Sequence, residues 1–288
     1  MTLSHTPKIA LIGFGEAACA FATGWGTTLA PQLSAYDIKA DNIAARVEAL
    51  GILCHAAPKM ALAGADVALC LVTADQALAA AVACAPHVSP GLIWLDGNSC
   101  APGTKRKAAA VIDGAGGRYV DMAIMAPVHP DLSRTPALLS GPHAGAALSA
   151  LAALNMRLSI AGPAVGDAST IKMLRSVMVK GFEALTAECL LAARRAGVEE
   201  AVVASLEASD PGWNFRQRGS YNLERMLVHG TRRAAEMREV ALTLRDMGLP
   251  GRMAAASAQW QDDIGGLGAD AGPDDLARRL DAVLDRLP

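Results

Sequence analysis

The sequence predicts an α/β fold in which a doubly wound sheet is followed by an all-α domain. Short apolar runs alternate with alanine-rich helical stretches in the first part of the chain, and strand signals stop after residue 160. Strands that alternate with helices form βαβ units, and continuous apolar runs are typical of parallel strands covered on both faces. A segment rich in glycine and proline at 162–166 separates the two parts. We therefore predict an α/β domain at 1–163 and an all-α domain at 164–288.

Seven apolar runs in the first domain are predicted to be strands, and glycine or proline punctuates the segments between them. The runs lie at 9–13, 33–37, 66–72, 92–96, 119–122, 137–140 and 156–160. The early runs are almost uninterrupted by polar residues, as expected for parallel strands that are covered on both faces.

The second domain is predicted to begin with one long helix at 167–195, which Gly197 ends. Further helices are expected at 199–207, 221–247 and 273–287, with a linker at 265–273. The apolar face of the long helix is formed by Ile171, Leu174, Met178, Leu185 and Cys189.

The composition excludes several classes of protein. Hydrophobic residues make up 52% of the 288-residue chain, which is enough to build a core, so wholesale disorder is excluded. The net charge of −2 leaves no basic surplus to neutralise nucleic-acid phosphates. The most apolar stretch, 60–85, is interrupted by Asp66 and Asp75, whereas a membrane span needs ~20 nearly uncharged residues. We expect neither a nucleic-acid partner nor a membrane partner.

The cysteines, histidines and N-terminus predict a cytoplasmic protein without a metal site. None of the six cysteines forms a C-x-x-C pair and most lie in apolar runs, which is typical of reduced core thiols. The six histidines form no H-x-x-x-H pattern. The apolar run after Lys8 contains two glycines and is followed by Glu16, which is typical of a buried strand rather than of a signal peptide.

A glycine-rich turn after the first predicted strand indicates a dinucleotide site. The segment reads G-x-G-x-x-A and opens a helix. Two glycines allow the backbone to approach a pyrophosphate, a small third residue allows helix–strand packing, and the helix N-terminus supplies N–H donors. Asp37 ends the second strand 22 residues after Gly15, close to the ~20 expected for a ribose-binding carboxylate. The residues expected to contact the cofactor here are Gly13, Phe14, Gly15, Glu16, Ala17 and Asp37.

The expected cofactor is NAD, because the charge of Asp37 would repel the 2′-phosphate of NADP. Lys39 lies nearby and favours NADP, so the sequence does not exclude NADP. Further contacts are expected from loops at the carboxyl ends of later strands. These contacts are Val72, Thr73, Asn98 and Ser99. Thr73 and Ser99 could equally be helix caps.

Taken in order, these motifs resemble those of the β-hydroxyacid dehydrogenase superfamily, which includes 3-hydroxyisobutyrate and 6-phosphogluconate dehydrogenases. The likeness begins with the glycine turn and Asp37 and continues with 71–73 and with 96–102, which is similar to a D-x-S-T-x-x-P segment. Gly166-x5-Lys172 is similar to the G-x5-K that starts the family's long interdomain helix. The C-terminal third, including 229–233, resembles a less characterised branch of 6-phosphogluconate dehydrogenase-like proteins.

The resemblance implies an activity and an assembly. The implied reaction is hydride transfer between nicotinamide and a small β-hydroxy acid or related alcohol, with Lys172 as general acid/base and no metal ion. The implied site is the cleft between the domains. A homodimer that shares its helical domains is also implied.

Two positions depart from the family pattern. Met125 stands where the family has a substrate-binding serine, and Ser176 stands four residues after Lys172 where the family usually has asparagine. The chemistry can be kept while the substrate changes, so the substrate cannot be carried over from either named relative. We place Met125, Ser176 and Lys180 at the substrate.

Helical spacing is compatible with this placement. Lys172, Ser176 and Lys180 are four residues apart and share one stripe of a helix. Polar groups on a largely apolar helix are costly to bury without a purpose. The spacing alone also fits an ordinary solvated face. The roles of several further residues stay open, namely His129, His229, Arg216, Arg218, Arg225, Arg232 and Arg233.

Two alternative functions remain open at this stage. One is an imine reductase on the same architecture, against which Lys172 argues because hydride delivery to a protonated imine needs no lysine there. The other is a non-catalytic NAD-binding sensor, which the departures at Met125 and Ser176 leave possible.

Overall fold

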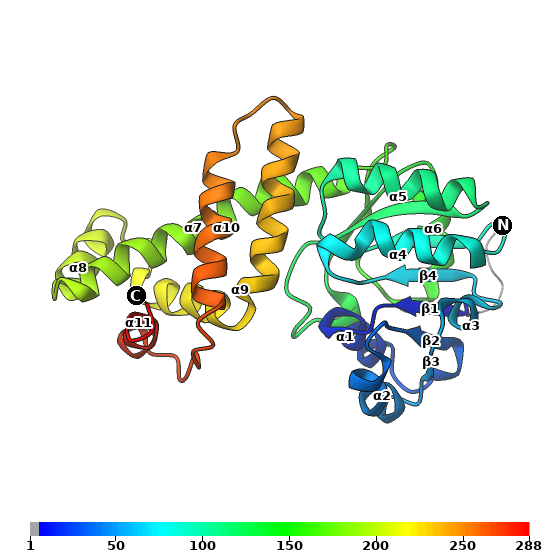
Figure 1. The fold of residues 1–288 in the computed structure, drawn as a ribbon, viewed down its shortest axis with the longest axis horizontal. Helices are drawn as coiled ribbons and strands as arrows, with labels where there is room; N and C mark the ends of the chain where they lie inside the picture. Colours follow the sequence, from blue (N-terminus) through cyan, green and yellow to red (C-terminus); the bar gives the residue numbers. More distant parts are fainter. Residues whose placement is uncertain (1–5, 288) are drawn as a thin grey trace. The chain divides into compact units, whose positions relative to one another are not determined.

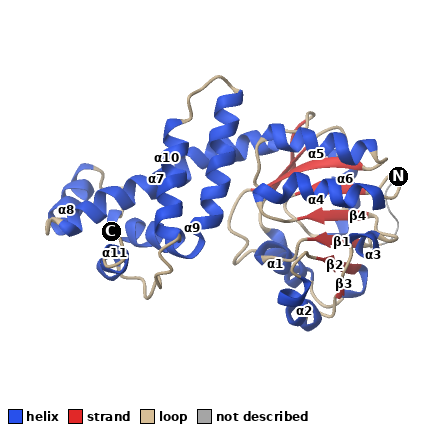
Figure 2. Cartoon of the chain, in the orientation of Figure 1, coloured by secondary structure: helices blue, strands red, loops and turns tan. Residues whose placement is uncertain are grey.

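The computed structural model describes residues 6–287, apart from the side chains of residues 41 and 42, and the chain forms two compact units. The first unit, Met1–Met173, holds the sheet, and the second, Leu174–Pro288, is helical (Figure 2). The predicted fold class is confirmed. The units divide ten residues beyond the predicted boundary at 163, because the first turns of the long helix are hydrogen-bonded to the sheet.

Within residues 6–287, eight strands form one sheet in the order β3-β2-β1-β4-β5-β6-β7-β8. All neighbours are parallel except β6 and β7, which are antiparallel. The strands are β1 (Ile9–Ile12), β2 (Leu33–Tyr36), β3 (Leu53–His55), β4 (Val67–Cys70), β5 (Ile93–Asp96), β6 (Arg118–Ile124), β7 (Ala137–Ser140) and β8 (Leu158–Gly162). The first six have the order of a Rossmann sheet, whose ligand crevice lies at the carboxyl ends of the strands.

The strand register brings the functional loops to one edge of the sheet. Ile12 pairs with Tyr36 on one side and with Cys70 on the other, and Cys70 pairs with Asp96. The loops that start at residues 13, 37, 71 and 97 therefore leave the sheet at one level.

Helices cover both faces of the sheet (Figure 1). One face carries α1 (Glu16–Trp25), α2 (Ala40–Ala49) and α6 (Ala144–Ala150), and the other carries α3 (Pro58–Leu62), α4 (Ala77–Cys84) and α5 (Pro102–Gly114). Short 3-10 turns lie at Ala30–Gln32, Ala74–Gln76, Ala85–His87, Leu132–Arg134 and Ala152–Leu154. Every residue of β1, β4 and β5 is buried, which explains why these strands are apolar throughout except for Asp96 at the end of β5.

All seven predicted strands are present, with ends that differ by at most two residues. The additional strand is β3, which the sequence did not predict. It has three residues and lies at the edge of the sheet, where Leu53 is 69% exposed and Cys54 is also exposed. A short exposed edge strand does not need the apolar run that marks a buried one.

The long helices end close to the predicted residues. They are α7 (Asp167–Arg195), α8 (Glu199–Ser209), α9 (Phe215–Asp246), α10 (Arg252–Gly265) and α11 (Leu276–Leu284). Helix α7 has the predicted ends, whereas α9 starts six residues early because Asn214 caps it by accepting a hydrogen bond from the Gln217 amide. None of the helices between residues 6 and 287 is long and apolar enough to cross a membrane.

Helix α10 was not predicted, because alanine and polar residues make up most of its sequence and few large apolar residues mark its buried face. It packs antiparallel to α9 with the two backbones in contact. A β-carbon at Gly230 would lie 2.6 Å from the Cα of Gly265. Glycine at both positions therefore allows the two helices to approach more closely than any other residue would.

Candidate active site

The glycine turn after β1 has the geometry that a dinucleotide requires. Gly13 has a φ of +86°, and a β-carbon there would lie 2.6 Å from the Leu71 carbonyl oxygen, so only glycine fits. Gly15 is exposed, and no outside atom lies within 4 Å of where its β-carbon would be. Ala18, the small third residue, is completely buried. The turn thus presents bare backbone and a helix N-terminus to open space, which fits a pyrophosphate.

Asp37 holds this turn in place. Its Oδ2 accepts a hydrogen bond of 2.8 Å from the Phe14 amide, and its Oδ1 accepts one of 2.8 Å from the Lys39 amide. Each carboxylate oxygen has further lone pairs that could accept ribose hydroxyls. The residue expected to bind ribose therefore also fixes the loop expected to bind the pyrophosphate.

The remaining residues of the turn offer backbone rather than side chains. Phe14 buries its ring in the core, and its amide is already bonded to Asp37. Glu16 is exposed and Ala17 partly buried in the first turn of α1, where helix N–H groups lack intrahelical acceptors. These amides are the groups that could donate to an anion.

Asn98 joins the loops after β4 and β5. Its side-chain oxygen accepts a 2.6 Å hydrogen bond from the Val72 amide, and its side-chain nitrogen donates a 2.7 Å bond to Asp96 Oδ1. Asn98 is only 3% exposed. The structure therefore uses its amide group to hold two predicted cofactor loops together, while Thr73 stands exposed at the start of a 3-10 turn.

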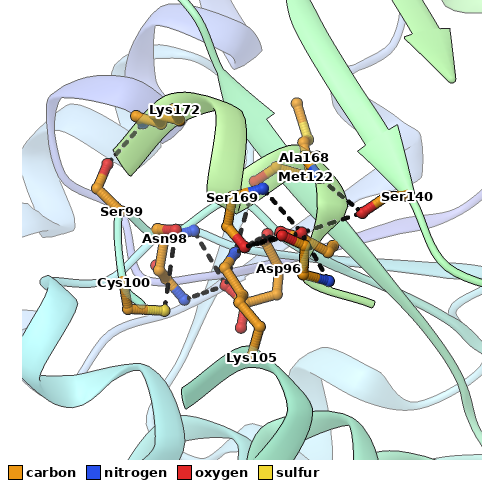
Figure 3. A network of polar contacts seen from close by, with 12 residues as sticks. Asp96, Asn98, Ser99, Cys100, Lys105, Met122, Ser140, Ala168, Ser169 and Lys172 are labelled. Carbon is orange, nitrogen blue, oxygen red and sulfur yellow. Dashed lines mark hydrogen bonds and ion pairs between the residues drawn. The ribbon is translucent and has the colours of Figure 1, made fainter. Parts of the chain in front are cut away.

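Two predicted site residues that are far apart in sequence meet in the structure. Lys172 Nζ donates a 2.6 Å hydrogen bond to Ser99 Oγ (Figure 3). Lys172 lies on the second turn of α7 and Ser99 in the loop after β5, and both side chains are partly buried. An amine and a hydroxyl are thus brought together at the carboxyl edge of the sheet, the same edge at which the glycine turn follows β1.

A buried charge cluster lies next to this pair. Lys105 Nζ is 3.0 Å from Asp96 Oδ1 and 3.3 Å from Asp121 Oδ1. All three side chains are completely buried. Lys105 also donates to the Asp96 carbonyl oxygen at 2.5 Å.

The two carboxylates determine the ionisation of their neighbours. Burial alone would lower the pKa of Lys105, but Asp96 and Asp121 outweigh burial and raise its pKa, so the ammonium stays charged. Burial raises the pKa of Tyr119 well above its usual value, and Asp96 raises it further. The neutral Tyr119 hydroxyl donates to Asp96 Oδ2 at 2.7 Å.

Asp121 also anchors the start of α7. Its Oδ2 accepts hydrogen bonds from the amides of Gly166 (3.2 Å) and Ser169 (2.9 Å) and from Ser169 Oγ (3.0 Å). Ser140 Oγ donates to the same oxygen at 3.1 Å and accepts from the Ala168 amide (Figure 3). A carboxylate at a helix N-terminus is favoured by both the free amides and the helix dipole.

This cluster was not predicted, although the sequence contains a signal for it. Lys105 shares a helix face with Ala108, Ala109 and Ile112, all of them buried, so it is a lone charge on an apolar stripe. Asp96 ends the otherwise apolar β5, and Asp121 is flanked by apolar residues within β6. A lone cation and two strand acids of this kind indicate a buried ion pair.

Within the second unit, Lys180 and Ser176 are buried on α7. Lys180 Nζ lies 2.9 Å from Glu236 Oε2 and 3.4 Å from Ser176 Oγ. A second buried pair, between Arg233 and Glu183, lies on the same two helices, and Glu183 also accepts from Gln261. Lys180 is therefore an ion-paired residue rather than an isolated cation.

Met125, His129 and the arginines of the second unit lie in different parts of the structure. Met125 is partly buried directly after β6, and His129 is exposed. Arg216 pairs with Glu200, Arg232 with Glu236, and Arg218 stacks over the Tyr221 ring. Most of the arginines that lie close together in the sequence thus contact other residues of the helical unit.

Comparison with known proteins gives matches over both units. Residues 8–143 match the family described as the NAD binding domain of 6-phosphogluconate dehydrogenase, and residues 193–264 match a domain of unknown function, DUF1932. A conserved hypothetical protein from Sinorhizobium meliloti 1021, solved by crystallography, is 37% identical over 99% of this chain and 98% of its own, with a TM-score of 0.75.

More distant solved structures extend the likeness. Conserved protein MTH1747, of unknown function and structurally similar to 3-hydroxyacid dehydrogenases, is 29% identical over 91% of this chain and 99% of its own, with a TM-score of 0.66. 3-Hydroxyisobutyrate dehydrogenase from Mycobacterium tuberculosis, solved with L-serine, is 12% identical over 96% and 98%, with a TM-score of 0.72. At that identity the likeness is one of fold.

Lys105→Met is expected to destabilise the protein by about 3–5 kcal/mol, because two buried carboxylates lose their counter-charge. The matched control is Lys107→Met on the same helix, where the lysine is exposed and the expected change stays within about 0.5 kcal/mol. Urea unfolding followed by circular dichroism measures both. Equal stability of the two variants would show that the cluster does not depend on the Lys105 charge.

Proposed function

Since this chain belongs to the β-hydroxyacid dehydrogenase superfamily, we propose that it is an NAD-dependent oxidoreductase that transfers hydride between nicotinamide and a small β-hydroxy acid, with Lys172 as general acid/base. The observation that carries the proposal is the 2.6 Å hydrogen bond between Lys172 Nζ and Ser99 Oγ. It places an amine at the edge of the sheet where the glycine turn and Asp37 also lie.

The residues at the carboxyl edge would hold the cofactor. The amides of Glu16 and Ala17 would donate to the pyrophosphate, and Asp37 would accept the ribose hydroxyls. Val72, Thr73 and the backbone of Asn98 would border the nicotinamide half. When bound, the nicotinamide accepts or gives up the hydride.

Lys172 would handle the proton. In oxidation, the substrate hydroxyl transfers its proton to the neutral Lys172 amine as the carbon loses hydride, and in reduction the ammonium returns the proton to the carbonyl oxygen. Ser99 would orient the amine, since its hydroxyl accepts from Lys172 and can itself donate to a substrate oxygen. This scheme uses no metal ion.

Met125, Ser176 and Lys180 would contact the substrate. Met125 offers an apolar surface after β6, and Ser176 with Lys180 offers a hydroxyl and an ammonium on α7. A small acid needs such a cation for its carboxylate. Glu236 already neutralises the charge of Lys180. Ser176 and Lys180 would therefore orient the substrate carboxylate by hydrogen bonding more than by net charge.

We also propose a homodimer. The apolar stripe predicted on the long helix is exposed in the single chain: Leu174 is 41%, Met178 59% and Leu185 58% exposed. These positions lie within one face of α7, so they form a continuous apolar strip that a second copy would cover.

NAD is expected to have a higher kcat/KM than NADP, because the Asp37 carboxylate repels a 2′-phosphate. Asp37→Asn should narrow the difference between kcat/KM with NAD and kcat/KM with NADP. The asparagine side chain keeps an acceptor for the Phe14 N–H but has no charge. Asp66→Asn is the matched control, because Asp66 also accepts a backbone N–H but precedes β4 at the opposite edge. Equal use of both cofactors by the unmodified protein would contradict the assignment.

Among 3-hydroxy acids, kcat/KM is expected to rise with the size of the substrate's apolar side chain, because Met125 offers an apolar surface. Each added methylene should contribute at most about 1–3 kcal/mol of transition-state binding. Met125→Ser should flatten this series. Initial rates with NAD across the homologous acids measure the trend. A flat series, a best rate with polar sugar acids, or NADH-dependent reduction of a cyclic imine without hydroxy-acid turnover would point to another substrate.

Lys172→Ala is expected to lower kcat by about 10²–10⁴-fold, the contribution usual for a general acid/base, while the Kd for NADH changes little. Lys172→Arg should restore little activity because arginine stays protonated. Lys107→Ala, at an exposed site on α5, serves as the control. Steady-state kinetics and NADH fluorescence titration give the two readouts. Tight NADH binding with no turnover of any substrate by the unmodified protein would favour a sensor.

A further inference from the structure

We propose that the buried cluster of Asp96, Lys105 and Asp121 positions Lys172 against Ser99. The inference rests on the role proposed for Lys172 in the preceding section. The three cluster residues act through other residues, so they are positioning residues and not catalytic ones. The cluster has two arms, by which we mean two sets of hydrogen bonds. One set holds the loop that carries Ser99 and the other holds the helix that carries Lys172; Figure 3 draws the hydrogen bond between these two residues.

The first arm fixes the loop that carries Ser99. Asp96 Oδ1 accepts hydrogen bonds from the Asn98 amide at 3.0 Å and from the Asn98 side chain at 2.7 Å. Asn98 is in turn bonded to the Val72 amide and is the residue before Ser99. Asp96 therefore determines where the Ser99 backbone lies after β5.

The second arm fixes the first turn of α7. Asp121 Oδ2 accepts from the amides of Gly166 and Ser169 and from the Ser169 hydroxyl. Lys172 follows Ser169 by three residues, so it lies on the same side of the helix about one turn later. Holding the amides of the first turn sets both the rotation and the axial position of the helix start, and with them the direction of the Lys172 side chain.

Lys105 joins the two arms. Its ammonium lies 3.0 Å from Asp96 Oδ1 and 3.3 Å from Asp121 Oδ1, and it is itself completely buried. Without that charge, the two carboxylates would repel each other in a completely buried site, where charges are poorly screened. The Lys105 ammonium therefore holds Asp96, which fixes the Ser99 loop, at a set distance from Asp121, which fixes the start of α7.

The double variant tests the connection without changing the formal charge of the cluster. Lys105→Gln alone leaves two buried carboxylates and can fail to fold. The double variant Lys105→Gln/Asp121→Asn removes one positive and one negative charge, so the formal charge of the cluster is unchanged. Ser169→Ala removes a single donor to Asp121. Its matched control is Thr170→Val, which loses a neighbouring hydroxyl that bonds to the Gly166 carbonyl and not to Asp121.

The first readout is the acetylation rate of Lys172 by an N-hydroxysuccinimide acetate ester, measured on the full chain by peptide mass spectrometry. Loosening the cluster should release the amine from Ser99 and raise the rate by about threefold or more, the factor expected for loss of one hydrogen bond. Ser169→Ala should give a smaller rise, and Thr170→Val none. The rate at exposed Lys107 is the internal reference. An unchanged Lys172 rate in the folded double variant would overturn the inference.

The second readout is kcat with NAD and the 3-hydroxy acid that the unmodified protein oxidises fastest. The double variant should lose about 10–10²-fold in kcat with little change in the KM for NAD, as displacement of a reacting group does. In a Lys172→Ala background, the same double variant should cause little further loss, whereas general structural damage would cost the same factor in both backgrounds and would overturn the inference. If Lys172 acetylation rises but Lys172→Ala keeps full kcat, the positioning stands and the proposed acid–base role fails.

Discussion

A lysine ammonium lies between two carboxylates within the first unit, and all three side chains are completely buried. Burying such charges carries a large desolvation penalty, which is offset only when every charge is paired and hydrogen-bonded. Donors from β6, β7, α7 and the loop after β5 satisfy most of these oxygens, namely the Tyr119 hydroxyl, the Asn98 amide, and the donors of Ser140 and Ser169. Asp121 Oδ1 has the ion pair with Lys105 at 3.3 Å and no hydrogen bond within residues 6–287. The need to satisfy these charges fixes β5, β6, β7 and the start of α7 relative to one another.

The candidate site consequently combines two kinds of chemistry at one edge of the sheet. Backbone groups around Gly15 suit an anion and place few demands on side chains. Side chains of Lys172 and Ser99 suit the movement of a proton, and they need exact placement by residues behind them. Asp37 serves the first part and Asp121 the second, in each case by accepting backbone N–H groups.

Patterns local in the sequence predicted the fold well, because buried parallel strands and a long helix leave continuous signals. The ends of α7 and the turn from Gly13 to Ala18 follow from such patterns. Features that depend on distant partners were not predictable. The role of Lys105 depends on strands 9 and 16 residues away, β3 is defined only by pairing with β2, and the Glu236 partner of Lys180 lies on another helix.

The double use of Asp37 constrains how this protein could change its cofactor. Exchanging the residue for alanine would admit a 2′-phosphate but would also leave the Phe14 amide without its acceptor. A neutral residue that keeps a side-chain oxygen, such as asparagine, removes the charge and still gives that amide an acceptor. A change of cofactor at this position is therefore restricted to residues that also hold the glycine turn in place.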